Sequence, residues 1–403
     1  MKRRSFGKLA GAASLAGLVG SARGEGRERH SLAVIGHSGR GDYGHEMDTL
    51  WRRVPEVRVV ALSDPEAKGR VAAMQRVGEF AKEVTGFSDY REMLSKVKPA
   101  LVSIAPRHVD QHAEMLAACV EAGVRGVYLE KPMCATLAEA DRMVALCERS
   151  GLKLALAHRW RYHPVLPVLR KLLDEGLVGK ILEVRLRGKE DGRGGLQDAW
   201  VLGSHEFVVA RALFGDPVGC SAQLFQGERL AEPRDVRAGG EGIPHLAGNA
   251  LHARFDLADG TPLFFDSVAG AGTREAGFGL QIVGNAGVLD LRIDQEPFAH
   301  FRAGNPFNPR EKKEQGWQIV STAGVGKAEA IPQLSAALWQ HLLPVADLLA
   351  SLDDPERQPL CDAREGRLTV EMIHAMMRSH VRGGARVEMP LAEREAHPFE
   401  TWS

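Results

Sequence analysis

The chain has 403 residues, of which 44% are hydrophobic and 26% charged, and these values suit a water-soluble globular protein with two domains. Its 52 basic and 52 acidic residues balance, so the net charge gives no reason to expect a nucleic acid or an anionic membrane as partner. The five cysteines are widely spaced, no pair has zinc-ligand spacing, and their odd number excludes a framework in which all are disulfide-bonded; we expect most of them in the core.

The first 29 residues are typical of a targeting segment. The sequence Arg3-Arg4-Ser5-Phe6-Gly7-Lys8 resembles a twin-arginine (Tat) export signal. An apolar stretch at 9–19 is too short to span a bilayer, and small residues at 20–22 offer a cleavage site. We therefore expect residues 1–29 to be a Tat-like signal and linker, and the mature protein to be periplasmic without a membrane span. A disordered basic tail is the alternative.

An apolar strand at 32–36 runs directly into a glycine-rich turn, Gly36-His37-Ser38-Gly39-Arg40-Gly41. A second apolar strand, at 57–63, is followed by Asp64. This order is the fingerprint of a dinucleotide-binding βαβ unit. Gly36 lets the chain turn off the strand, and Gly41 lets a following helix pack on the sheet, with its first N–H groups free for a pyrophosphate. An ordinary strand–turn–helix loop is the alternative.

The glycine pattern has two registers. A register that starts at Gly39 matches G-x-G-x-x-G literally but begins late, so we favour Gly36-x-Ser38-x-x-Gly41, in which a serine replaces the second glycine. Asp64 lies roughly 20 residues beyond the turn, where an acid accepts hydrogen bonds from the adenosine ribose and repels a ribose phosphate. The expected cofactor is NAD, and the nearby cations Arg40 and Lys68 leave NADP open.

Residues 30–157 alternate short apolar strands with amphipathic helices, which predicts a doubly wound, mostly parallel sheet. The expected strands are 32–36, 57–63, 101–104, 126–129 and 153–157, with helices at 109–123 and 137–150.

From residue 158 the pattern changes to alternating apolar and polar residues, typical of strands with one wet face. The expected strands are 181–187, 251–257, 263–268, 279–283, 288–293 and 386–391, with closing helices at 333–352 and 363–382. We expect residues 158–403 to form an α+β domain with a mostly antiparallel open sheet, whose free face would join copies into a homo-oligomer. Glycine-rich loops at 188–195, 238–248 and 269–279 are expected to rim a cleft.

The tripeptide Glu130-Lys131-Pro132 follows the strand at 126–129. Ligands of doubly wound sheets bind beyond the carboxyl ends of the strands. A lysine there can bond a substrate hydroxyl and act as acid or base if desolvation lowers its pKa. Lys131–Pro132 is also a candidate for a cis peptide bond. The alternative is a surface Glu–Lys pair at a strand end.

Taken together, the motifs resemble those of the glucose–fructose oxidoreductase / inositol dehydrogenase (Gfo/Idh/MocA) family over nearly the whole chain after the signal. They are the glycine turn, Ala61-Leu62-Ser63-Asp64, Ser103-Ile104-Ala105-Pro106 with His112, Glu130-Lys131-Pro132, Arg161-Tyr162-His163-Pro164, Gly203-Ser204-His205, and the closing helix with Val387-Glu388-Met389-Pro390-Leu391.

The resemblance implies a nicotinamide dinucleotide across the first domain, with a sugar or cyclitol over its ring. It implies a catalytic role for Lys131 and a dinucleotide contact for Glu130. It also implies that Arg161 contacts cofactor or substrate, and that the cofactor is lined by Ala105, Pro106 and His112.

The family's catalytic histidine corresponds to His205, four residues after a customary acid. Val201 stands at that acid position, which removes a carboxylate that would orient the imidazole. Glu190, Asp191 or Asp198 could replace it. Alternatively, His205 caps the helix expected at 206–213.

Polar and aromatic residues after the strand at 153–157 and before His205 could line a sugar site, and packing between the domains is an equal alternative; they are His158, Arg159, Trp160, Tyr162 and Trp200. The cluster His108, Asp110 and His112 lacks further ligands, so no metal is expected.

The sequence thus indicates an NAD(P)-dependent oxidoreductase that acts on a sugar, polyol or related carbohydrate by hydride transfer. A redox-neutral, NAD-dependent glycoside-cleaving enzyme is one alternative. A non-catalytic sugar-binding protein on the same fold is another; Val201 favours it, whereas the presence of Lys131 and His205 speaks against it.

Overall fold

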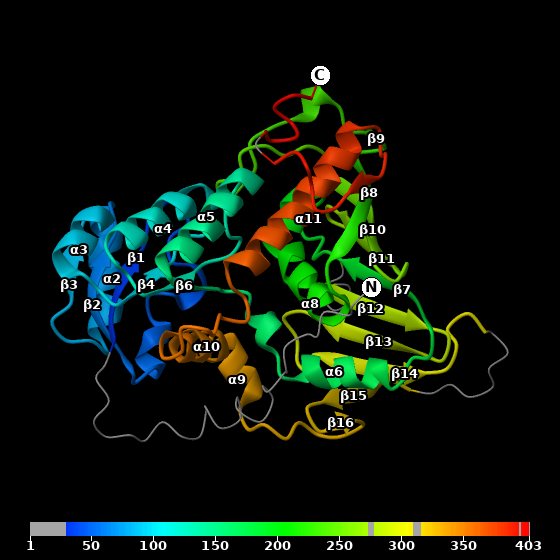
Figure 1. Ribbon diagram of the computed structural model, residues 1–403, viewed down its shortest axis with the longest axis horizontal. Coiled ribbons are helices and arrows are strands. Elements are labelled where there is room, and N and C mark those ends of the chain that lie inside the picture. Colours follow the sequence, from blue (N-terminus) through cyan, green and yellow to red (C-terminus); the bar gives the residue numbers. More distant parts are fainter. Residues whose placement is uncertain (1–29, 273–277, 309–315, 395, 403) are drawn as a thin grey trace.

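The computed structural model describes residues 30–272, 278–308, 316–394 and 396–402. Two β-sheets lie side by side, the first surrounded by helices and the second carrying helices mainly on one side (Figure 1). The expected Tat-like signal lies outside the described residues. Within them, no helix combines the length and the apolar character needed to cross a bilayer.

The first sheet is parallel throughout, with strand order β3-β2-β1-β4-β5-β6. This is the doubly wound order of dinucleotide-binding domains. Its strands are β1 (His30–Ile35), β2 (Val57–Ser63), β3 (Thr85–Phe87), β4 (Leu101–Ile104), β5 (Gly126–Leu129) and β6 (Lys153–Leu156). The five expected strands are confirmed. Only the short β3, whose Thr-Gly-Phe sequence is too brief for a periodic signal, was not anticipated.

Helices cover the first sheet on both faces, which is why β1, β4, β5 and β6 read as continuous apolar runs (Figure 1). They are α2 (Ala67–Gly78), α3 (Tyr90–Val97), α4 (His112–Glu121) and α5 (Leu137–Ser150). The start of α5 is fixed by a capping box between Thr136 and Glu139, and its end by Gly151 at φ 72°. The expected helix at 109–123 begins with a 3₁₀ turn, η3 (Val109–Gln111), before α4.

The segment after β1 corrects one expectation. In residues 36–56, all of which are described, the helical pieces are two 3₁₀ turns, η1 (Gly44–Glu46) and η2 (Leu50–Arg53), instead of an α-helix. Asp42, His45 and Glu46 have φ values of 51°, 47° and 58°, which a right-handed helix cannot contain. The prediction of an α-helix directly after the glycine turn is therefore wrong. A phosphate bound at this turn would accept hydrogen bonds from the N–H groups of the turn itself.

In the described residues the second sheet has eleven strands, in the order β16-β15-β14-β13-β12-β7-β11-β10-β8-β17, with β9 paired to β8. All pairs are antiparallel except β7 with β11, so the mostly antiparallel sheet is confirmed. The strands are β7 (Ile181–Arg187), β8 (Pro217–Gln226), β9 (Arg229–Leu230), β10 (Ala250–Leu257), β11 (Pro262–Val268), β12 (Gly279–Gly284), β13 (Gly287–Arg292), β14 (Ala299–Ala303), β15 (Gln318–Ser321), β16 (Gly324–Val325) and β17 (Val387–Glu388).

Three helices accompany the second sheet: α6 (Val165–Asp174), α8 (Ser204–Phe214) and α11 (Ala363–Val381) (Figure 1). Beyond β17, α11 also satisfies backbone groups of β8. Ser379 Oγ accepts a hydrogen bond from the Ala222 N–H at 2.8 Å, and His380 Nδ1 accepts one from the Leu224 N–H at 3.1 Å. The expected strand at 386–391 is shorter than predicted, because two of its residues, Val387 and Glu388, pair with β8 as a strand.

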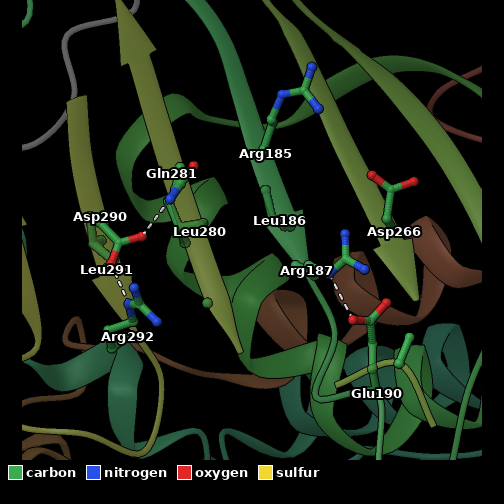
Figure 2. A pocket seen from close by; sticks show the side chains of 12 residues that line it. Arg185, Leu186, Arg187, Glu190, Asp266, Leu280, Gln281, Asp290, Leu291 and Arg292 are labelled. Atoms are coloured by element: carbon green, nitrogen blue, oxygen red, sulfur yellow. Dashed lines mark hydrogen bonds and ion pairs between the residues drawn. The ribbon is translucent and has the colours of Figure 1, made fainter. Parts of the chain in front are cut away.

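The opposite face of the second sheet is open and charged (Figure 2). It holds a shallow cavity of about 420 Å³ beside Arg187, which pairs with Glu190, and beside Arg292, which pairs with Asp290. Leu186, Leu280 and Leu291 alternate with these residues and are buried. The strands therefore have one wet face, as the alternating sequence predicts.

The expected single helix at 333–352 is broken. It consists of α9 (Leu334–Trp339) and α10 (Leu342–Leu352), separated at His341, whose φ is 58°. Val345 and Leu348 of α10 join the apolar core cluster of the first sheet, so a helix from the C-terminal half of the chain covers the N-terminal sheet. The break allows α10 to turn onto that sheet.

The cysteines behave as core residues. Cys119, Cys134, Cys220 and Cys361 are buried, Cys147 is partly buried, and all five are free thiols. Burial raises the pKa of each thiol above its ordinary value, so these groups remain protonated and unreactive at neutral pH.

Candidate active site

A cavity of about 460 Å³ opens at the carboxyl edge of the first sheet. Gly36 at the end of β1 and Ser63 at the end of β2 form its floor, and His37 and Arg40 of the glycine turn stand at its rim. The other lining residues are Pro65, Ser88, Asp89, Tyr90, Asp110, Gln111, Glu114 and Met115. Its place, where the strand order reverses between β1 and β4, is where doubly wound sheets bind nucleotides.

Gly41 is required by close packing as well as by backbone conformation. Its φ is 94°, and a Cβ there would lie 2.5 Å from the Arg107 nitrogen and 2.6 Å from the His108 nitrogen. Its carbonyl oxygen accepts a hydrogen bond from the Arg107 N–H at 3.1 Å. Gly39 also has a positive φ of 77°, but a Cβ there would meet nothing within 4 Å. The turn is thus joined to the segment after β4 through Gly41.

Asp64 is fully buried, and neighbouring backbone and side-chain groups donate hydrogen bonds to its carboxylate. Ser38 donates both its N–H, at 3.1 Å, and its hydroxyl, at 2.7 Å. The Tyr43 hydroxyl donates at 2.9 Å, and the Glu66 N–H donates at 2.9 Å. The Tyr43 ring also lies across the strand end, because a Cβ on Gly36 would come within 2.1 Å of it. The sequence identified Asp64 and Ser38 but not Tyr43, whose role depends on the irregular turn.

Glu130 and Lys131 lie at the carboxyl end of β5 and are almost completely buried, at 0% and 4% exposure. The peptide bond between Lys131 and Pro132 is cis. The Lys131 ammonium donates to the Val201 carbonyl oxygen at 3.0 Å. Burial lowers the pKa of Lys131 below its ordinary value, against the opposing charge of Glu130. The alternative prediction, an exposed Glu–Lys pair at the end of a strand, is therefore wrong.

One oxygen of Glu130 is paired and the other is not. Oε1 lies 2.8 Å from Nδ1 of His45, whereas Oε2 is buried without a partner among the described residues. Burial opposes the charge of Glu130, but His45 and Lys131 hold its pKa down at about 2. An ionised buried oxygen without a donor fits a ligand hydroxyl, such as the nicotinamide ribose expected here.

Two buried histidines face each other beside Lys131. Nδ1 of His158 lies 3.4 Å from Nδ1 of His205, and the rings meet edge to face with centroids 5.0 Å apart. Burial and the charge of Lys131 lower both pKa values, that of His158 to about 3. Both imidazoles are therefore neutral at ordinary pH.

The expected acidic partners of His205 are wrong. Asp198 accepts from the Ser267 hydroxyl at 2.7 Å and the Glu190 N–H at 3.0 Å. Glu190 pairs with Arg187, and Asp191 pairs with Arg193. None of these three carboxylates bonds His205, and Asp198, at the end of α7 (Leu196–Asp198), keeps its Oδ1 buried without a partner among the described residues.

Two further residues join the polar cluster: Arg159, which follows His158 after the first sheet's last strand, and His341. Arg159 is buried and donates to Asp294 at 3.0 Å, and its guanidinium lies 4.0 Å from the ring centroid of Trp339. His341, in the break between α9 and α10, contacts the Tyr128 hydroxyl and lies 5.7 Å, centroid to centroid, from His45. The sequence offers one signal for His341: it interrupts the otherwise apolar stretch in which a single helix at 333–352 was expected.

His112 joins the segment after β4 to the loop after β5 by hydrogen bonds. Its Nε2 lies 2.7 Å from the Pro106 oxygen, and its Nδ1 lies 3.0 Å from the Pro132 oxygen and 3.1 Å from the Met133 oxygen. Ala105 accepts a hydrogen bond from the Gly44 N–H at 2.8 Å. These contacts hold the segment after β4 against both the glycine turn and the Lys131 loop. Whether Ala105, Pro106 and His112 also touch a cofactor stays a prediction.

Several expected contact residues serve packing. The Trp160 ring is stacked with those of His163 and Phe298, and the Tyr162 hydroxyl accepts a hydrogen bond from the Cys361 N–H at 3.1 Å. Trp200 is fully buried against His374 on α11, and Arg161 lies 3.6 Å from Glu365 at the start of α11. Trp160, Tyr162 and Trp200 are thus buried in packing contacts, and their part in a sugar site stays a prediction. His158 is the member of the set that faces the Lys131 cluster.

Two of the glycine-rich loops close over the site. The Glu241 carbonyl oxygen of the 238–248 loop accepts a hydrogen bond from the Val109 N–H at 3.1 Å, which joins the two halves of the chain. Arg193 of the 188–195 loop lies 3.8 Å from the Glu241 carboxylate. The expected rim is therefore present, and part of the third loop, 273–277, lies outside the described residues.

Residues 31–158 match the model of the Gfo/Idh/MocA oxidoreductase family, described as an NAD-binding Rossmann fold. The N-terminal domain is thus similar to this oxidoreductase family. Its cofactor class is therefore NAD, as the glycine turn predicts. The Gfo/Idh/MocA match ends at His158, so it leaves the function of the second sheet open.

Curated relatives are similar to this chain over part of their length. D-apiose dehydrogenase of Paraburkholderia graminis is 30% identical over 199 residues, which are 46% of this chain and 51% of that protein. Inositol 2-dehydrogenase 1 of Saccharopolyspora erythraea is 34% identical over 149 residues, 36% of this chain and 42% of that protein. The chain thus spans about half the length, or less, of these curated relatives.

The fold similarity extends further than the sequence similarity. A levoglucosan dehydrogenase crystallised with NADH and L-sorbose superimposes with a TM-score of 0.67 at 16% identity, over 90% of this chain and 99% of that one. At this identity the match establishes the fold of both sheets. The residues that surround Lys131 must therefore be argued from this chain.

Tyr43 should compete with the cofactor for Asp64. We expect Tyr43→Phe to raise the affinity for NAD by up to about tenfold, because one hydrogen bond to a charged group, on the order of 1.5 kcal/mol, no longer has to be displaced. Isothermal titration calorimetry of the cofactor-free protein measures this. Ser38→Ala removes the second hydroxyl from the same carboxylate and should act in the same direction. A loss of affinity in Tyr43→Phe would show that the hydroxyl assists binding.

The buried neutral histidines should make the protein sensitive to acid. The pKa values of His158, His341 and His374 are lowered by burial to about 3, from an ordinary value of 6.5. Below pH 6.5 these histidines are protonated in the unfolded chain but neutral in the folded chain. The free energy of unfolding therefore falls by about 1.4 kcal/mol for each pH unit of acidification and for each histidine. Urea denaturation at pH 7.0, 6.2 and 5.5 measures the slope. His374→Gln, outside the Lys131 cluster, should lower the slope by the contribution of one histidine, about 1.4 kcal/mol per pH unit at most.

Proposed function

We propose that this chain is an NAD-dependent oxidoreductase that transfers hydride between a carbohydrate, such as a sugar or polyol, and the nicotinamide. The observation that carries the proposal is the buried Lys131 at the carboxyl end of β5, with Glu130 and the pair His158–His205 beside it. A lysine this buried is expensive to keep unless a reaction uses it.

The electrostatics around Lys131 suit acid–base work. Burial favours its neutral amine, and a neutral amine can take the proton of a substrate hydroxyl as the carbon loses hydride. The bound nicotinamide would supply the hydride acceptor. Glu130 would hold the cofactor through its unpartnered Oε2, and His205 would contact the same hydroxyl or its neighbour.

The acid Asp64 supports NAD over NADP. Its buried carboxylate would repel a ribose 2′-phosphate at the position where the family binds the adenosine ribose. Arg40, the cation that left NADP open, is engaged in an ion pair with Asp110. Calorimetry with both dinucleotides tests this preference.

A screen for hydride transfer tests the proposed reaction. The cofactor-loaded protein is mixed with a panel of aldoses, inositols and other polyols, and reduced nicotinamide is followed by absorbance. Formation of NADH with at least one member supports the proposal. The levoglucosan and inositol dehydrogenase relatives justify including anhydrosugars and cyclitols in the panel.

The two other candidate functions give different results in the same assay. A redox-neutral glycoside-cleaving enzyme would release a sugar from a glycoside without net NADH. A sugar-binding protein would bind a member of the panel without any product. Product analysis by mass spectrometry beside the absorbance assay therefore separates the three.

We further propose export and self-association. The Tat-like sequence at residues 3–8 supports export of the folded protein to the periplasm, where free dinucleotide is scarce, so the cofactor would be loaded in the cytoplasm and held tightly. The open charged face of the second sheet supports a homo-oligomer (Figure 2). Fractionation of cells, release of dinucleotide on denaturation and analytical ultracentrifugation test these points in turn.

A further inference from the structure

The structure assigns to His158 the role of a positioning residue that replaces the carboxylate missing at Val201 and fixes which ring nitrogen of His205 carries its proton. The role in catalysis rests on the proposed function, whereas the hydrogen bond between the two rings does not. Their Nδ1 atoms lie 3.4 Å apart, within hydrogen-bonding reach.

The chemistry of the contact defines the two tautomers. Two neutral imidazoles can join through their Nδ1 atoms only if one ring donates an N–H and the other accepts with a lone pair. The donor ring then has a bare Nε2, and the acceptor ring has a protonated Nε2. The pair therefore leaves one acceptor and one donor for a substrate, both from neutral groups.

The surroundings keep both rings in this neutral state. Burial first, and then the charge of Lys131, lower the pKa of both rings. Both rings are at most 5% exposed. An imidazolium in either position would be desolvated next to Lys131, so a proton is not stored on this pair.

The three acids that the sequence offered do not bond His205. Glu190 and Asp191 pair with arginines, and Asp198 bonds Ser267 through Oδ2 while its Oδ1 is buried without a partner among the described residues. The backbone of residue 201 uses its carbonyl oxygen to accept from Lys131. Val201 therefore positions Lys131 through its main-chain carbonyl group. His158, in the loop after β6, orients His205 in place of a residue-201 side chain. A neutral partner orients His205 as a carboxylate would, but does not stabilise a charged form of it.

Nuclear magnetic resonance of protein labelled with ¹⁵N-histidine tests the assignment without any substrate. We expect one Nδ1–H that couples through the hydrogen bond to a second, unprotonated Nδ1. In His158→Phe the coupling should disappear, and the His205 nitrogens should shift toward the tautomer mixture of free imidazole. His163→Gln is the matched control, because His163 is equally buried but pairs with Glu296 at 3.1 Å, outside the cluster.

Two protonated Nε2 atoms without coupling, or His205 signals unchanged in His158→Phe, would overturn the assignment. If His158→Phe fails to fold, His158→Gln decides the question, because its amide can keep a hydrogen bond and should hold His205 in one tautomer. Where a turnover assay exists, His158→Phe should lower kcat by on the order of 100-fold, with KM and NAD affinity unchanged, and His158→Gln should restore part of the loss. A tautomer signature without turnover would instead count against the proposed reaction alone.

Discussion

Replacing Lys131 with methionine should reduce turnover by roughly 10²–10⁴-fold while the protein still binds NAD. Methionine has a similar volume and fits the buried position, so the core should not collapse. The amine that would take the substrate proton is lost, and the Val201 carbonyl oxygen loses its donor. Steady-state kinetics with the best member of the carbohydrate panel, together with calorimetry for NAD, measure the two effects separately.

Lys153→Met provides the matched control. Lys153 is 7% exposed and also donates to main-chain oxygens, those of Pro355 at 2.6 Å and Arg357 at 2.8 Å, but it lies on β6 outside the cluster. This variant should lose stability and keep its kcat. Equal kinetics in Lys131→Met and the unaltered protein would remove Lys131 from the reaction.

The substitution Gly41→Ala should abolish measurable NAD binding, the second large effect. The new methyl group would lie 2.5 Å from the Arg107 nitrogen, so either the glycine turn or the segment after β4 must move. Strain at φ 94° and overpacking together should cost about 2–4 kcal/mol of unfolding free energy. Calorimetry and urea denaturation measure binding and stability.

Gly39→Ala separates steric clash from backbone strain. Gly39 also has a positive φ, 77°, but a Cβ there would meet no atom within 4 Å. It should therefore cost only about 1 kcal/mol and leave NAD binding nearly intact. If both variants lose NAD equally, flexibility of the turn matters more than its packing against Arg107.

The order of motifs along the chain predicted the first sheet well, because its strands are short, apolar and separated by turn residues. In the second sheet β8, β14 and β15 were not among the expected strands. Helix α5 was predicted with its observed bounds, since Thr136, Glu139 and Gly151 mark its ends locally. The segment after β1 was predicted wrongly, because the positive φ values at Asp42, His45 and Glu46 come from packing against Glu130 and the segment after β4. Periodicity carries no information about such contacts.

The site was predicted in part. Lys131, Glu130 and His205 belong to contiguous motifs and could be identified one by one. Tyr43 and His341 could not, because each acquires its role from a partner far away in sequence: Asp64 and Tyr128. The packing contacts of Trp160 with Phe298 and of Tyr162 with Cys361 likewise join distant parts of the chain.

The sequence by itself determined that β1 leads into a glycine turn at a nucleotide-binding edge and that a lysine ends β5, because both are local patterns of strand and turn residues. Only the tertiary structure decided what surrounds that lysine. Burial between two sheets sets the charge of each group there, and chain segments more than 40 residues apart bring His158 against His205. Electrostatic energy and hydrogen bonding depend on distance in space, which the order of residues does not contain.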